Sequence, residues 1–174
     1  RIGCEEVLRA MKDHPHYKSP LNGPNQGRGV SIGYWFNVGF KSACTISVNA
    51  DGTISLIEGS TDIGGSRASI SMQAAEVLGI RAEDVRATVA DTDSVGYTEV
   101  TGGSRVTYAT GWAAYLAAED VKKQMIKRAA LIWGVEADSL EMVDGVTKSK
   151  TDNELKMTFK ELAKELEGSG GSIA

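Results

Sequence analysis

The sequence predicts an α+β fold, in which a mixed sheet carries helices packed on one face as a two-layer sandwich. Three observations predict it. Polar and apolar residues alternate on both sides of the turn Asp51-Gly52, which indicates a β-hairpin over residues 45–56. The apolar spacing then becomes helical up to Gly79 and again over residues 107–133. An alternating segment at 83–90 lies between the two helices and predicts a further strand.

Residues 1–26 are interpreted as an N-terminal helix and a connector. Apolar residues fall on one side of a short helix at 5–12. All three prolines of the chain lie within residues 14–26, as expected of a connector. His14 and His16 could share a metal ion, but no third ligand accompanies them, so a surface loop is favoured over a metal site.

Glycine positions help to place the ends of the other elements. A run of β-forming and aromatic residues at 30–40 is interrupted by glycines, which predicts a bent or bulged strand. Gly79 and Gly134 follow the last apolar positions of the two longer helices, where C-cap glycines are common. Residues 91–100 are polar and predict a loop.

The C-terminal part predicts one short strand and one helix. Residues 140–146 form the strand, with turn residues on both sides. Residues 158–166 form the helix, in which Thr158 and Glu161 have the spacing of a capping box. The sequence contains neither a strand followed by GxGxxG nor a GxxxxGK[ST] motif, so a parallel nucleotide-binding fold is not indicated.

The composition limits the classes of function. The chain has 174 residues, 41% hydrophobic and 24% charged, with a net charge of -4, as in globular proteins. It has no basic cluster, which argues against a nucleic-acid partner. No apolar run is long enough for a membrane span and no signal peptide is visible, so a cytoplasmic location is expected. Cys4 and Cys44 lack metal-binding spacing and are expected to be reduced thiols.

Two segments of similar sequence carry the strongest functional signal. Residues 61–69, here called the first loop, and residues 99–107, the second loop, both contain Gly-Gly-Ser-Arg and precede predicted helices. Adjacent glycines permit positive φ angles and close approach of a ligand to the backbone. The first N–H groups of a helix have no partner inside it and attract anions. We therefore expect the loops to bind the anionic part of a cofactor, the alternative being ordinary helix capping.

The serines and arginines of the two loops have several possible roles. Ser66 and Ser104 could donate hydroxyl hydrogen bonds to a ligand. Arg67 and Arg105 could add charge-assisted contacts to it. The arginines could instead pair with acidic residues of the chain, the candidates being Asp62, Asp91 and Asp93.

The order of these motifs resembles the molybdenum hydroxylases, which are the large subunits of xanthine dehydrogenase, aldehyde oxidase and aerobic carbon monoxide dehydrogenase. The resemblance runs from about Gly27 to Val146 and rests on the order and spacing of several motifs. These motifs are Gly27-Arg28-Gly29, the hairpin ending at Gly59, Thr61 to Ser66, Glu76 to Gly79, Asp91-Thr92-Asp93, Thr101 to Ser104, and Gly111.

The resemblance implies that residues 27–174 are part of the second molybdopterin-binding region of a longer chain. Such a subunit oxidises aldehydes, purines or related C–H substrates with water-derived oxygen. It passes electrons to iron–sulfur and FAD subunits or domains, and its cofactor is molybdopterin with molybdenum, in the cytosine dinucleotide form in bacteria. The implied cofactor-binding residues are Ile63, Gly64, Gly65, Ser66, Arg67, Gly102, Gly103, Ser104, Arg105 and Thr107.

Two departures from the family pattern limit what the resemblance implies. The family's first loop is Gly-Gln-Gly, whereas Gly65 and Ser66 stand here in place of the Gln and the second Gly. The family's catalytic Glu lies in a Gly-Glu motif, and no Glu of this chain follows a Gly. We therefore expect no catalytic residue in this chain, no cofactor bound to it alone, and no activity without the remaining domains of the large subunit.

Two other readings stay open, a non-catalytic assembly module that kept the scaffold and a free-standing binder of a phosphate ligand. We also expect the chain to expose apolar surface, where further domains would pack, and to self-associate through it.

Overall fold

The computed structural model describes residues 3–89 and 93–174 and divides into two compact units, Arg1–Trp35 and Phe36–Ala174. The sequence analysis placed a domain boundary at residues 26/27, which stays a prediction. The predicted loop at 91–100 includes Asp91, which lies outside the described residues.

The first unit contains the helices α1 (Cys4–Asp13) and α2 (Pro15–Lys18), so the predicted N-terminal helix is confirmed. The side chain of His14 accepts a hydrogen bond from the N–H of His16 at 3.1 Å and caps α2. Among the residues that the structure describes, no group of three His, Cys, Asp or Glu side chains could hold a metal ion.

The second unit is built around a three-stranded mixed sheet. Strands β1 (Cys44–Val48) and β2 (Ile54–Glu58) pair antiparallel, and β3 (Val85–Val89) pairs parallel with β2. Because parallel neighbours need a crossover, helix α3 (Ser66–Leu78) connects β2 to β3. The mixed sheet, the hairpin and the third strand were predicted correctly.

The Asp51-Gly52 turn closes the hairpin with local hydrogen bonds. Asp51 Oδ1 accepts from the N–H of Thr53 at 2.9 Å, and the N–H of Asn49 donates to the carbonyl of Thr53 at 2.9 Å. Gly52 has a φ of 84°, which favours glycine. The turn therefore fixes the register of β1 against β2, and with it the face of the sheet that is buried.

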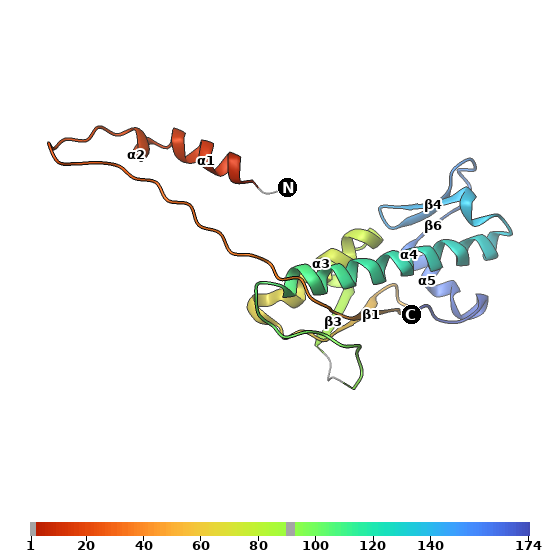
Figure 1. The fold of residues 1–174 in the computed structure, drawn as a ribbon. Helices are drawn as coiled ribbons and strands as arrows, with labels where there is room; N and C mark the ends of the chain where they lie inside the picture. Colours follow the sequence, from red (N-terminus) through yellow and green to blue (C-terminus); the bar gives the residue numbers. More distant parts are fainter. Residues whose placement is uncertain (1–2, 90–92) are drawn as a thin grey trace. The chain divides into compact units, whose positions relative to one another are not determined.

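Helices α3 and α4 (Gly111–Trp133) cover the buried face of this sheet (Figure 1). Alternate strand residues pack with the inner faces of the two helices in one core. The strands contribute Ile46, Val48, Ile54 and Leu56, helix α3 contributes Ile70, Ala74 and Leu78, and helix α4 contributes Ala114, Ala118, Val121 and Met125. Alanines on the inner face of α4 let the two helices approach closely. Gly79 (φ 68°) and Gly134 (φ 67°) cap α3 and α4 in the left-handed conformation, as predicted.

A second, antiparallel sheet contains β4 (Leu140–Val143), β5 (Val146–Ser149) and β6 (Lys156–Thr158). The sequence predicted a single strand at 140–146, which is wrong. Asp144 (φ 49°) and Gly145 (φ 72°) form a tight turn inside that range, and the chain returns as β5. Two left-handed residues in sequence are typical of a hairpin turn, so the Asp-Gly pair was a hairpin signal here as well.

Helix α5 (Phe159–Glu165) follows the second sheet, and its predicted capping box is confirmed. The N–H of Glu161 donates to Thr158 Oγ1 at 3.2 Å, and the N–H of Thr158 donates to Glu161 Oε2 at 2.8 Å. These bonds pair two N–H groups that the first turn of the helix leaves free.

The C-terminal end of α3 makes a close backbone contact with the turn between β4 and β5 of the second sheet. A Cβ atom on Gly79 would lie 2.0 Å from the backbone nitrogen of Gly145, and one on Gly145 would lie 2.3 Å from the carbonyl oxygen of Gly79. Both positions therefore require glycine for space as well as for φ.

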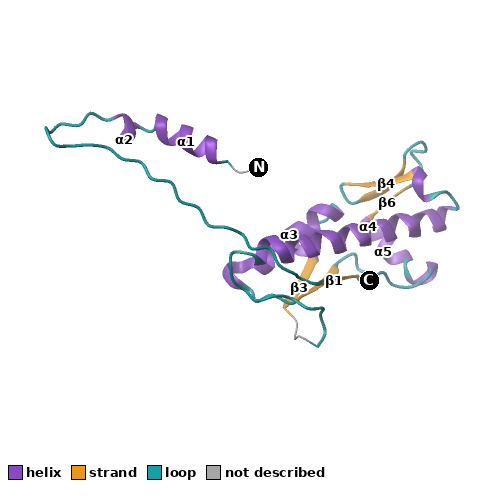
Figure 2. Ribbon diagram, in the orientation of Figure 1, coloured by secondary structure: helices purple, strands orange, loops and turns teal. Residues whose placement is uncertain are grey.

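The predicted strand at 30–40 is absent from the described structure, where residues 27–43 form no strand (Figure 2). Within the second unit, Gly39 (φ 68°) and Phe40 (φ 66°) interrupt any extended run. The backbone around them bonds to the second loop instead of to a neighbouring strand. None of the helices in the described ranges is long and apolar enough to cross a membrane.

Candidate cofactor-binding site

The two Gly-Gly-Ser-Arg loops meet in space. Thr61 Oγ1 of the first loop donates a hydrogen bond to Thr101 Oγ1 of the second at 3.0 Å. A cavity of about 360 Å³ opens between the loops. Its lining comes from both loops and consists of Ile63, Thr101, Gly102, Ser104, Arg105, Val106 and Thr107. Five of the predicted cofactor-binding residues thus share one cavity.

The first loop turns through two left-handed glycines and then starts a helix. Gly64 has a φ of 60° and Gly65 a φ of 79°, and α3 begins at Ser66. A Cβ atom on either glycine would have no neighbour within 4 Å, so the loop is open on that side. Ser66 is buried and its hydroxyl donates to the carbonyl of Thr61 at 3.4 Å, so this hydroxyl is used within the protein.

The carboxylate of Asp62 lies at the N-terminus of α3, whose N-cap residue is Gly65. Its Oδ1 accepts from the N–H of Arg67 at 2.9 Å, and its Oδ2 lies 3.3 Å from Arg67 Nε. The pairing of Arg67 with Asp62, one of the predicted alternatives, is confirmed. A carboxylate near the helix N-terminus already interacts with its partial positive charge, so this end of α3 is a poor site for a second anion.

The second loop contains the same Gly-Gly-Ser-Arg motif, but its backbone has a different conformation. Here Gly103 (φ 66°) and Ser104 (φ 57°) are the left-handed pair, one position later in the motif than Gly64 and Gly65. As a result Ser104 is exposed and Arg105 is fully buried, with 0% of its surface accessible. A π-helical turn (Val106–Thr110) leads from the loop into α4.

The buried guanidinium of Arg105 holds the second loop against residues 37–42. It donates to the carbonyls of Gly39 at 2.7 Å, Lys41 at 2.6 Å and Glu99 at 2.9 Å. It also donates to the carbonyl of Val100 and to the hydroxyl of Ser42. Carbonyl and hydroxyl oxygens accept these hydrogen bonds, and Asp91, one of the predicted partners of the arginines, lies outside the described residues. The contact of its side chain with a cofactor stays a prediction.

Residues 37–39 clamp the left-handed pair of the second loop. Asn37 Nδ2 donates to the carbonyl of Ser104 at 2.8 Å, and the N–H of Val38 donates to the carbonyl of Gly103 at 3.2 Å. A Cβ atom on Gly103 would lie 2.5 Å from a methyl group of Val38. This clamp was not predicted from the sequence, although an Asn within an apolar run was a visible signal.

A network of buried polar groups lies beneath both loops. Ser42 Oγ is 2.8 Å and Ser60 Oγ is 2.6 Å from Thr110 Oγ1. The N–H of Ser60 donates to Glu58 Oε2 at 2.6 Å, whereas Glu58 Oε1 is buried without a described partner. Burial raises the pKa of Glu58, and Asp62 raises it further. Burial, together with Glu58, also raises the pKa of Cys44 to about 12, so this thiol stays protonated.

The buried carboxyl of Glu58 predicts a pH-dependent stability. A folded-state pKa above the unfolded value means that its stabilising effect is complete below the unfolded pKa and is lost as the pH rises through the folded pKa. We expect the free energy of unfolding to fall across that window in urea titrations, and Glu58→Gln to remove the fall. Asp51→Asn is the control, because the pKa of Asp51 is lowered and its contribution is lost in the opposite direction, as the pH falls. An unchanged slope in Glu58→Gln would contradict the assignment.

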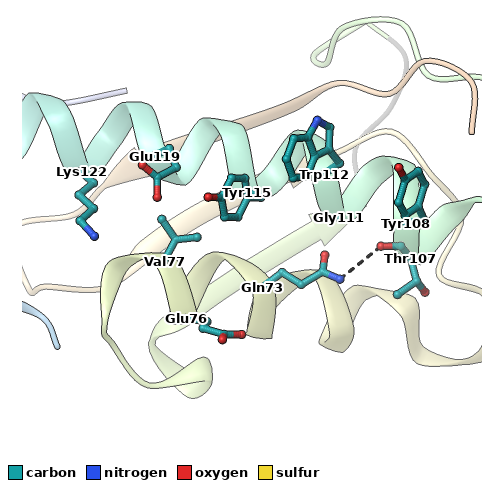
Figure 3. Close-up of a pocket in the computed structure, with 10 residues that line it drawn as sticks. All are labelled: Gln73, Glu76, Val77, Thr107, Tyr108, Gly111, Trp112, Tyr115, Glu119 and Lys122. Atoms are coloured by element: carbon teal, nitrogen blue, oxygen red, sulfur yellow. Dashed lines mark hydrogen bonds between the residues drawn. The ribbon is translucent and has the colours of Figure 1, made fainter. Parts of the chain in front are cut away.

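A groove of about 480 Å³ continues from Thr107 along α3 and α4 (Figure 3). Gln73 Nε2 donates to the carbonyl of Thr107 at 3.3 Å, and the rings of Trp112 and Tyr115 stack with centroids 4.9 Å apart. Trp112 is 56% exposed, and Tyr108 beside it is 64% exposed. The chain therefore exposes apolar surface, as expected, while its self-association stays a prediction.

Comparison with known proteins identifies the family to which this chain belongs. The family model of the molybdopterin cofactor-binding domain matches residues 8–173. The protein named "Probable hypoxanthine oxidase XdhD" from Escherichia coli K12 is 31% identical over 155 residues, which are 84% of this chain and 16% of that protein. The xanthine dehydrogenase molybdenum-binding subunit of Escherichia coli O157:H7 is 32% identical over 149 residues, 80% of this chain and 20% of that protein.

Solved structures agree with these relatives. The reconstituted CO dehydrogenase from Oligotropha carboxidovorans has a TM-score of 0.67 at 28% identity over 72% of this chain and 16% of its own. Quinoline 2-oxidoreductase from Pseudomonas putida 86 shares the fold, with a TM-score of 0.62 at 20% identity over 72% of this chain. The chain thus spans about one-sixth to one-fifth of its relatives, and it belongs to the molybdopterin cofactor-binding domain family, as a part of the large subunit of a molybdenum hydroxylase.

Proposed function

We propose that the cavity between the two loops receives the anionic part of molybdopterin, and that the second loop makes the main polar contacts. The cavity itself carries this proposal, because both loops of a molybdopterin-binding family line it. The exposed hydroxyl of Ser104 borders it as a donor, and a Cβ atom on Gly102 would meet nothing within 4 Å, which leaves room for a ligand. The first loop forms the opposite wall through Ile63. The carboxylate of Asp62 at the N-terminus of α3 supports this division of roles.

When bound, the cofactor would supply the oxygen-transfer and redox chemistry, and Ile63, Gly102 and Ser104 of this chain would hold and orient it. We propose the cytosine dinucleotide form of the cofactor. The whole subunit would then oxidise an aldehyde, a purine or a related C–H substrate, working with iron–sulfur and FAD partners. The catalytic Glu would lie outside this chain, which would be inactive alone. A cytoplasmic location remains our expectation.

The variant Ser104→Gly tests the role of the second loop. Glycine tolerates the φ of 57°, so we expect the variant to be about 0.5–1 kcal/mol more stable than the parent. It loses the hydroxyl donor, so we expect the cofactor-free full-length protein with this substitution to bind cytidine 5′-diphosphate, used as the probe, at least about fivefold more weakly in calorimetry. Stability and binding then change in opposite directions.

The variant Asp144→Gly is the matched control. Asp144 is another exposed non-glycine residue with a positive φ, 49°, and it lies in the turn of the second sheet. We expect it to gain stability and to keep the affinity for the probe. Equal affinity in the parent and in Ser104→Gly would refute the proposed contact.

The absence of a Gln at position 65 favours a second candidate, a non-catalytic assembly module. The open space beside Gly65 would accommodate a longer side chain, and this chain has none there. Metal and pterin analysis of the full-length protein from a cofactor-competent host separates the two candidates. We expect molybdenum and pterin in near-equal amounts, and protein free of both would establish the assembly module.

A further inference from the structure

We propose that Thr110 is a positioning residue that couples the two loops through a relay of hydroxyl groups, in which Thr110 and Ser60 are buried and Ser42 is half-buried. The relay lies below the cavity and runs from Arg105 of the second loop to Glu58, which ends the strand before the first loop. The inference rests on the proposed function in one respect, namely that the coupled loops carry the ligand.

The relay is continuous. Arg105 Nη2 donates to Ser42 Oγ at 2.6 Å, and Ser42 Oγ lies 2.8 Å from Thr110 Oγ1. Thr110 Oγ1 lies 2.6 Å from Ser60 Oγ, and the backbone N–H of Ser60 donates to Glu58 Oε2 at 2.6 Å. Thr110 and Ser60 are almost completely buried, with 0% and 1% of their surfaces exposed. The bond between Thr110 and Ser60 is therefore shielded from water.

The direction of the bonds follows from the chemistry of the two ends. A guanidinium only donates hydrogen bonds, so Ser42 accepts from Arg105 and has its own hydrogen free for Thr110. Thr110 can then donate to Ser60, whose backbone N–H donates to the carboxyl of Glu58. A chain in which each hydroxyl donates in the same direction polarises its members and strengthens each bond. Thr110 is the central link, since it bonds to Ser42 on one side and to Ser60 on the other.

The position of Thr110 in the backbone explains why it reaches both loops. It is the last residue of the π-helical turn that follows the second loop. Its partner Ser60 directly precedes the first loop. A π-helical turn is often found at functional sites. Moving Thr110 would therefore move the start of one loop and the end of the other.

Amide hydrogen exchange on this chain tests the coupling without any ligand. Thr110→Val keeps the shape of the side chain and removes the hydroxyl, which breaks two bonds of the relay. We expect exchange in residues 61–66 and 101–105 to become about tenfold faster or more, and Thr110→Ser to restore the parent rates. Thr147→Val is the matched control. Thr147 is also 0% exposed, but its hydroxyl has no described partner.

The outcomes are distinct. Faster exchange in both loops with Thr110→Val, with neither Thr110→Ser nor Thr147→Val changing it, supports the coupling. Faster exchange in one loop only, or in neither, overturns it, as does an equal effect of Thr147→Val. Binding of cytidine 5′-diphosphate then separates this inference from the proposed function. If the full-length parent protein, freed of cofactor, does not bind the probe, the proposed function fails while the exchange result stands. If Thr110→Val binds it as tightly as the parent, the positioning role fails.

Discussion

Replacing Arg105 by methionine is expected to lower the free energy of unfolding by about 3–5 kcal/mol, a large part of the stability of a domain of this size. Methionine fills much of the same volume but donates no hydrogen bond. The carbonyls of Gly39 and Glu99 then lose their partner inside the protein, while the carbonyl of Lys41 and the hydroxyl of Ser42 each lose one of two. Urea denaturation followed by circular dichroism measures the loss.

The same substitution in the first loop is the control. Arg67 occupies the same letter of the motif, but its side chain is 50% exposed and its partner Asp62 is 31% exposed. An ion pair of this kind contributes less than about 1 kcal/mol, so Arg67→Met should have a small effect. Equal losses of unfolding free energy in the two variants would show that the buried hydrogen bonds of Arg105 do not stabilise the fold more than an exposed ion pair does.

Replacing Gly79 by alanine is expected to cost about 3 kcal/mol or more. The new methyl group would meet the backbone of Gly145 at 2.0 Å, and a backbone segment held in a hairpin turn cannot rotate away as a flexible side chain can. The left-handed φ of 68° adds about 1–2 kcal/mol for any residue with a Cβ atom.

Gly134→Ala separates the two causes. Gly134 caps α4 with a φ of 67°, nearly the same as that of Gly79, but a Cβ atom there would have no neighbour within 4 Å. We therefore expect Gly134→Ala to lose only about 1–2 kcal/mol, the cost of the conformation alone. The difference in thermal unfolding between the two variants measures the contact between α3 and the second sheet, and no difference would exclude it.

The elements that the sequence predicted correctly are those fixed by neighbouring residues. Asp51-Gly52, the capping box of Thr158 and Glu161, and the C-cap glycines all act over a few residues, and each lies where it was predicted. The predicted strand at 30–40 failed because β-forming residues need a partner strand. Near the second loop, the backbone bonds to Arg105 and Gly103 instead.

The candidate site was predicted in outline only. The sequence indicated that both loops precede helices, and the structure confirms it and adds that they meet through Thr61 and Thr101. It did not indicate that Ser66 and Arg105 are buried, because their burial depends on partners distant in the chain, such as Ser42 for Arg105. Nor did it indicate the network at Thr110, since isolated Ser and Thr residues carry no pattern.

The offset of the left-handed pair between the two loops has a consequence for how this chain is aligned with itself and with its relatives. Superposed by backbone conformation, Gly64 corresponds to Gly103, Gly65 to Ser104 and Ser66 to Arg105, each one position away from the match of the letters. The shared Gly-Gly-Ser-Arg therefore does not mark structurally equivalent positions in the two loops. A function transferred from one arginine to the other by motif alone would be assigned to a side chain with the opposite environment.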